Sequence, residues 1–132
     1  MDFTDYKDSL AAGENAVVRA TNGTSLSLAA NANAHVAAVQ LVNWGTMWLN
    51  AGSRLTVGNG VDPACVLMGY ETDIKGSGTL DFGTSEGVIS VGPAYYDEGH
   101  LLNCSIAGSG GVTYVGMPNY QVRLVTVNGA NT

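Results

Sequence analysis

The sequence is poor in charged residues, and in basic ones above all. Only 12 % of the 132 residues are charged, and five Lys or Arg stand against eleven Asp or Glu, for a net charge of −6. The basic residues are scattered, so they form no patch suited to a nucleic-acid backbone or to anionic lipid. We therefore expect no nucleic-acid partner and an acidic surface.

Long apolar runs and closely spaced cysteines are missing as well. No stretch approaches the roughly 20 apolar residues of a membrane-spanning helix, so we expect no membrane insertion by this segment. The N-terminal residues 1–15 are acidic and polar, unlike a signal peptide. Cys65 and Cys104 fit no metal-ligand or redox spacing, and buried free thiols are favoured over a disulfide.

Glycine, by contrast, is abundant, with 18 glycines against three prolines. Between the glycines lie short segments of β-branched and aromatic residues that alternate with period two and end at Gly, Asn or Asp, as β-strands do. The first ten residues favour a short N-terminal turn. The expected strands cover residues 16–20, 25–29, 35–42, 46–49, 54–57, 65–68, 79–82, 88–91, 101–106, 112–115 and 121–127.

Three of these strands follow a Gly-Ser turn and end in glycine: GSRLTVG from Gly52, GSGTLDFG from Gly76 and GSGGVTYVG from Gly108. Many short strands would also suit a β-sandwich. However, recurrence at intervals of 24 and 32 residues is typical of solenoids. The pattern therefore predicts an all-β fold, a parallel β-helix (β-solenoid) of about five to six coils. Its expected inward residues are Leu55, Val57, Leu80, Phe82, Val88, Ile89, Val112 and Tyr114 or Val115.

From about residue 45 onward the chain resembles the autotransporter-associated β-strand repeat family. The matching segments, in the family's order, are GSRLTVGNG (52–60), GSGTLDFGTSEGVISV (76–91), CSIAGSGGVTYVG (104–116) and VNGANT (127–132). The resemblance implies a right-handed parallel β-helix located outside the cell or on a bacterial cell surface, usually without catalytic activity of its own. We interpret residues 1–40 as an N-terminal cap with the first coils, and residues 41–132 as the β-helix repeats.

Two features depart from the family pattern. The segment MPNYQVRL (117–124) replaces the usual short glycine-rich linker, and family repeats normally continue beyond the point where Thr132 stands. We therefore expect either a portion of a longer passenger or a short protein of the same architecture.

Two segments carry candidate contact residues for a ligand or partner. The segment AYYDEGHLLNC (94–104) offers Tyr95, Tyr96, Asp97 and His100 as stacking, acidic and imidazole groups, although an ordinary polar loop is the favoured interpretation. Trp44 and Trp48 would share one face of an extended strand. Exposed, they would form a platform for sugar rings or a partner protein, but packing in the core is favoured for such large aromatics.

The sequence contains no GxSxG, HExxH or P-loop motif. We therefore expect no enzyme, no cofactor and no metal. A polysaccharide-lyase-like site would need several carboxylates converging on Ca²⁺ beside a basic residue, and Asp73, Lys75 and Asp81 are too scattered for it. The favoured hypothesis is a structural and adhesive segment, a stalk or display surface that contacts a glycan or a host or surface protein. The alternative is a homo-oligomer, a filament joined through the open solenoid ends.

Overall fold

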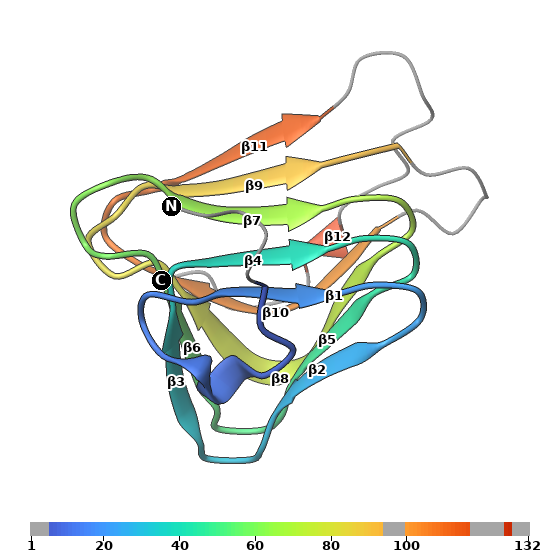
Figure 1. The fold of residues 1–132 in the computed structure, drawn as a ribbon. Coiled ribbons are helices and arrows are strands. Elements are labelled where there is room, and N and C mark those ends of the chain that lie inside the picture. Colours follow the sequence, from blue (N-terminus) through green and yellow to red (C-terminus); the bar gives the residue numbers. More distant parts are fainter. Residues whose placement is uncertain (1–5, 94–99, 117–125, 128–132) are drawn as a thin grey trace.

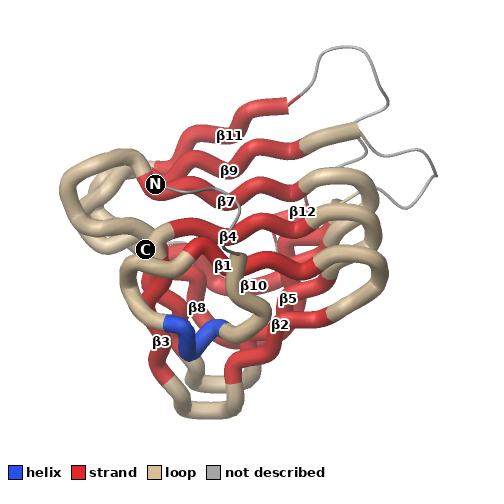
Figure 2. The backbone as a smooth tube through the Cα atoms, in the orientation of Figure 1, coloured by secondary structure: helices blue, strands red, loops and turns tan. Residues whose placement is uncertain are grey.

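The chain forms an all-β solenoid with three faces, and its first two complete coils contribute one short strand to each face. The computed structural model describes residues 6–93, 100–116 and 126–127. Figure 1 shows the strands of one face lying side by side, and Figure 2 shows the turns gathered at the corners. All pairing between strands is parallel and links one coil to the next.

Each face is built from corresponding strands of successive coils. The first face is β1 (Val17–Ala20), β4 (Ala38–Leu41), β7 (Ala64–Met68), β9 (Gly87–Val91) and β11 (Val112–Gly116). The second begins with β2 (Ser25–Leu28) and β5 (Thr46–Leu49), and the third with β3 (Asn33–Val36) and β6 (Arg54–Val57). The longer strands β8 (Asp73–Asp81) and β10 (Leu101–Ala107) bend across both the second and third faces, and β12 (Thr126–Val127) adds to the second.

The register gives the length of each coil. Along the first face Val17 pairs with Ala38, Ala38 with Cys65, Cys65 with Val88, and Val88 with Thr113. Successive coils therefore take 21, 27, 23 and 25 residues. The described residues complete four coils and begin a fifth, fewer than the five to six that the spacing predicted. The average coil is close to the expected length, but the described N-terminal residues before β1 form a cap and not a coil.

Inward side chains stack in columns that run along the axis. Because alternate residues point to opposite sides of a strand, each of the four-residue strands β1, β2, β4, β5 and β6 supplies two such positions. Three of these columns, all buried, are Val18–Val39–Val66–Ile89, Leu26–Met47–Ile74–Leu102 and Leu55–Leu80–Ile106.

Most of the residues predicted to point inward are buried. Val88 was also predicted to point inward, and this prediction is wrong. In β9 the buried positions are Gly87, Ile89 and Val91, so alternation turns Val88 outward. Tyr114 continues the Ile89 column in the outermost strand of the first face, where it stays partly exposed, and Val115 points outward beside Ser90.

Several strand boundaries also differ from the sequence-based expectation. Residues 35–42 form two strands on different faces, separated by a corner at Ala37. Residues 73–78 were not expected to be extended, yet they belong to β8. The GSRLTVG and GSGTLDFG segments occupy the same position in successive coils, whereas GSGGVTYVG leads into the first face instead.

The N-terminal residues cover one end of the stack. The 3₁₀ helix η1 (Leu10–Ala12) places Leu10, 2 % exposed, in the core cluster. Lys7 bridges to Val18 and exchanges backbone hydrogen bonds with the outer edge of β1. This arrangement matches the short cap expected at the N-terminus.

Both cysteines are free. Cys104 is buried, as expected, but Cys65 is exposed because it occupies an outward position of β7. In the part of the chain that the structure describes, no helix has the length and apolarity to cross a membrane.

Candidate functional site

Trp44 and Tyr70 lie in the turns that join the first face to the second, and Trp48 lies in the strand that follows the Trp44 turn. We call these three side chains the aromatic corner. Trp44 is 54 % exposed and meets the ring of Tyr70 edge-on, with ring centroids 5.3 Å apart and planes at 86°. The two residues belong to neighbouring coils, whose turns are joined by the Trp44 N–H donating to the Tyr70 carbonyl oxygen (3.1 Å). The corner therefore aligns aromatic rings along the solenoid axis.

The backbone at this corner adopts the left-handed conformation in successive coils. Asn22 in the first coil, Asn43 and Trp44 in the second, and Glu71 in the third all have positive φ. Asparagine tolerates this left-handed conformation, but a bulky residue such as Trp44, with φ of +63°, adopts it at a cost. Residues held in such sparsely populated conformations cluster at functional sites.

Trp48 is outward because of the alternation of β5. In β5 the alternating positions Met47 and Leu49 are fully buried, so Trp48 between them faces solvent and is 42 % exposed. The Lys75 ammonium group lies 5.7 Å from the centroid of its ring, and Lys75 is paired with the Asp73 carboxylate at 2.7 Å. The second face beside the corner thus carries an aromatic ring next to an ion pair.

Core packing was favoured for both tryptophans, and this prediction is wrong. The premise of one extended strand fails as well, because Trp44 lies in a turn and only Trp48 lies in a strand. Both side chains are nevertheless exposed and belong to the same coil, as a binding surface requires.

The structure removes His100 from the candidate contact residues, because its side chain is only 1 % exposed. Its Nε2–H donates to the Gly92 carbonyl oxygen (3.0 Å), and its Nδ1 accepts from the Thr72 N–H (3.3 Å). The imidazole therefore joins two corner segments inside the molecule. Tyr95, Tyr96 and Asp97, the other candidates of this segment, lie outside the described residues.

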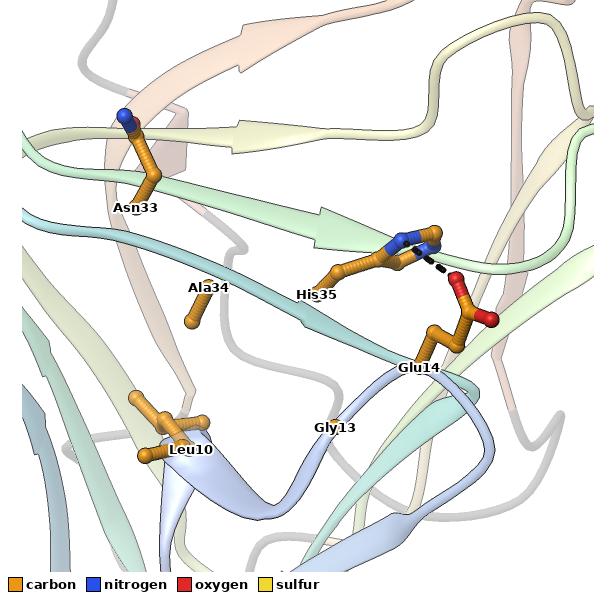
Figure 3. A pocket seen from close by; sticks show the side chains of 7 residues that line it. Leu10, Gly13, Glu14, Asn33, Ala34 and His35 are labelled. Atoms are coloured by element: carbon orange, nitrogen blue, oxygen red, sulfur yellow. Dashed lines mark ion pairs between the residues drawn. The ribbon is translucent and has the colours of Figure 1, made fainter.

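A hollow of about 410 Å³ lies between the N-terminal cap and β3 (Figure 3). Figure 3 shows the side chains of Glu14 and His35 pointing toward each other, with Oε2 and Nδ1 3.7 Å apart. The His35 Nε2–H donates to the Gly58 carbonyl oxygen (2.6 Å). No sequence signal links Glu14 to His35, because they are 21 residues apart in an unremarkable context, and the sequence analysis missed them.

The chemistry of this hollow is limited. Its lining combines one carboxylate and one imidazole with the apolar Leu10, small residues and the Asn33 amide. Among residues 6–93, 100–116 and 126–127, no group of three or more His, Cys, Asp or Glu is placed to hold a metal ion.

The residues considered for a lyase-like site do not converge. Asp73 and Lys75 pair with each other on the second face, whereas Asp81 pairs with Arg54 on the third (3.1 Å). The bend of β8 turns Asp81 away from the other two. The aromatic corner is therefore the best-supported candidate site.

Comparisons with protein-family models, with curated proteins and with solved structures found no match for this chain.

Proposed function

We propose that this chain is a non-catalytic structural and adhesive β-solenoid of the bacterial cell surface or extracellular space, and that it binds glycans through the aromatic corner. The resemblance of residues 45–132 to autotransporter passenger repeats supports the location and the stalk-like role. The arrangement of Trp44, Tyr70 and Trp48 supports the binding role.

The observation that carries the proposal is the exposure of both tryptophans in a coil whose inward positions are already filled by other residues. Fully burying a large apolar side chain stabilises a protein by roughly 1.5–3 kcal/mol. This chain forgoes part of that stabilisation at Trp44 and Trp48, which are about half exposed. Tyrosine and tryptophan rings provide large, rigid contact surfaces, and exposed apolar groups that cluster mark interaction sites.

The neighbouring polar groups suit a sugar better than an apolar partner. Lys75 and Asp73 lie beside Trp48 on the second face, and Ser27 is its partner in β2. A sugar ring presents C–H groups to an aromatic face and hydroxyl groups around its edge. The ion pair and the Ser27 hydroxyl would then hydrogen-bond to those hydroxyl groups.

The solenoid supplies the stalk. Each coil contacts only its neighbours, so a stack of coils forms a rigid rod whose corners and faces are available for display. Our second candidate, a head-to-tail filament, needs both ends open. Lys7 and Leu10 cover the N-terminal end, which weighs against it.

A broad glycan array with the wild-type protein tests the binding role, followed by titration of any ligand found. Trp44→Ala and Trp48→Ala should each weaken binding at least about tenfold, as removal of a central aromatic contact commonly does. The matched control is Val61→Ala, which shortens a highly exposed apolar side chain in the loop between β6 and β7.

Circular dichroism would verify that all three variants are folded. A ligand bound equally well by the wild type and both tryptophan variants would contradict the assignment of the site. If no glycan on the array bound the protein, the result would contradict glycan binding. The proposed stalk role would not be affected.

A further inference from the structure

The outward side of the second face carries an aromatic ring within a row of hydrogen-bonding groups. The row runs along the solenoid axis, because each of its residues is the register partner of the next one in β2, β5, β8 and β10. It consists of Ser27, Trp48, Lys75 and Asn103, and we call it the Trp48 row. Ser27 and Trp48 are exposed, and Lys75 and Asn103 are half-buried at outward positions of their strands.

The spacing of the Trp48 row suits consecutive units of a sugar chain. Neighbouring strands of a sheet lie about 4.8 Å apart, which is close to the length of one pyranose unit in an extended chain. From Ser27 to Asn103 the row crosses three such steps, about 14 Å in all. A chain of about three sugar units along the axis therefore spans the row, whereas a single sugar reaches only part of it.

Each side chain of the row can contact such a ligand. The Trp48 ring offers a flat face to the C–H groups of one sugar unit. The Ser27 hydroxyl and the Asn103 amide both donate and accept hydrogen bonds, and the Lys75 ammonium group keeps donors beyond the one directed at Asp73. Sugar hydroxyl groups, which also donate and accept, match all three of these polar groups.

The charges on this side of the second face cancel each other. Asp73 and Lys75 are the only ionisable side chains at its described outward positions, and their charged atoms are 2.7 Å apart. The other outward positions hold Ser25, Ser27, Thr46, Trp48, Leu101 and Asn103. Because no unpaired charge remains to attract an acidic sugar, the chemistry of this surface favours an uncharged one.

The aromatic corner borders the two middle coils of the row. Trp44 belongs to the same coil as Trp48, and Tyr70 belongs to the same coil as Lys75. The contact between the Trp44 and Tyr70 rings therefore runs from coil to coil, in the same direction as the row.

We propose that the glycan bound at the aromatic corner is an uncharged oligosaccharide of three or more units that lies along the Trp48 row, parallel to the solenoid axis. This inference rests on the proposed glycan binding and adds the length, charge and direction of the ligand. It assigns Ser27 and Asn103 as contacts at the two ends. A site confined to the aromatic corner would bind a disaccharide as well as a longer chain and would not involve Asn103, two coils beyond Trp48.

Calorimetric titration of the full chain tests the length and the charge. The probes are linear oligomers of glucose, mannose, galactose and N-acetylglucosamine, from the monosaccharide to the hexasaccharide. We expect at least one of these neutral series to bind, with the tetrasaccharide at least about tenfold tighter than the disaccharide and little further gain beyond it. Oligogalacturonate, which carries one carboxylate per unit, should bind more weakly than the best neutral series.

Two asparagine variants test the direction. Asn103→Ala should weaken binding of the tetrasaccharide about three- to tenfold, the effect of one lost hydrogen bond, and should leave binding of the disaccharide unchanged. Asn33→Ala is the matched control, because it makes the same substitution at an exposed position of the third face. Circular dichroism verifies the fold of each variant, and Ser27→Ala provides the same test from the other end of the row if Asn103→Ala does not fold.

Four results would overturn the inference: no binding of any neutral series, equal affinities for the disaccharide and the tetrasaccharide, tighter binding of oligogalacturonate, or equal tetrasaccharide binding by the Asn103→Ala and Asn33→Ala variants. Failure of the proposed function gives a different pattern. It would appear as a broad array without any ligand, or as a ligand whose binding does not depend on Trp44 and Trp48.

Discussion

At the scale of single residues, burial separates the two histidines of this chain. His100 is enclosed and bonded through both ring nitrogens, whereas the His35 side chain is 40 % exposed and contacts Glu14 and the Gly58 carbonyl. The sequence context placed His100 among the candidate contact residues, in a segment interpreted as an ordinary polar loop, and gave no sign that its imidazole is enclosed.

His100→Ala should lower the free energy of unfolding by about 2–4 kcal/mol, because it leaves a cavity and removes the partners of the Gly92 carbonyl and the Thr72 N–H. His35→Ala, the control, should cost no more than about 1.5 kcal/mol, since water replaces its contacts. Urea denaturation of both variants measures the difference. Equal losses would mean that the imidazole of His100 is not enclosed as described.

Cys104 gives the stability of this protein a dependence on alkaline pH. Burial raises the pKa of its thiol from 9.0 to about 11, partly offset by a backbone hydrogen bond at Leu80. The unfolded chain ionises this thiol above pH 9 while the folded chain does not, so the stabilising contribution is complete below pH 9 and is lost as the pH rises toward 11.

A shift of this size corresponds to about 2–3 kcal/mol. We therefore expect the free energy of unfolding of the wild type to fall by this order between pH 9 and 11, and Cys104→Ala to show a clearly smaller slope. Some slope will persist, because burial also raises the pKa of Cys65 and of Tyr114. Identical slopes in wild type and variant would exclude Cys104 as the source.

At the scale of elements, the decisive feature is how β8 passes from the second face to the third. Gly76 has a φ of +115° at this bend, and a Cβ there would overlap the carbonyl oxygen of Leu49 in the coil below. Backbone atoms of a neighbouring coil cannot move aside without breaking the pairing of the strands.

Gly76→Ala should therefore cost about 3 kcal/mol or more, or prevent folding. The control is Gly83→Ala, also at positive φ (+58°) but with open space around the added methyl group, where only the left-handed conformation costs about 1 kcal/mol. Thermal unfolding of the two variants compares them. A loss at Gly76 as small as that at Gly83 would contradict the tight bend.

Strands were predicted correctly where the sequence carries a clear apolar strand signal between turn residues. They were missed where that signal is weak. The segments 46–49 and 54–57 were predicted with their observed bounds. The second, RLTV, alternates polar and apolar residues, and the first, TMWL, is a short apolar run between the turn residues Gly45 and Asn50. The strand portion at Asp73–Lys75 has one inward residue, Ile74, between two charged ones, so it carries almost no apolar signal.

At the scale of the whole molecule, the cap at the N-terminus decides whether the solenoid has one covered end. Leu10 lies over the first coil, packed into the core cluster, while its neighbour Ala11 is exposed. Removing the Leu10 side chain exposes apolar side chains of β2 and β3 and the backbone edges of these strands. Such open strand edges are templates for pairing with another chain.

Leu10→Asp should lower the free energy of unfolding by about 2–5 kcal/mol and produce large oligomers at low micromolar concentration. Ala11→Asp adds the same charge one residue away and should behave like the wild type. Light scattering and sedimentation distinguish the two. A monodisperse, fully stable Leu10→Asp variant would show that η1 does not protect the end of the stack.

The sequence by itself determined the strand and turn chemistry: period-two alternation, glycine and asparagine at corners, and recurrence at a coil's length together predicted an all-β solenoid with a polar N-terminal cap. These are local properties, since each depends on residues only a few positions apart. The tertiary structure alone decided that Trp44 and Trp48 are exposed, that His100 is buried and that Val88 points outward. Burial depends on which residues of the neighbouring coil, 21 to 27 positions away, lie against a side chain. That register is set by the lengths and backbone conformations of the corners, which the alternating pattern of the strands does not encode.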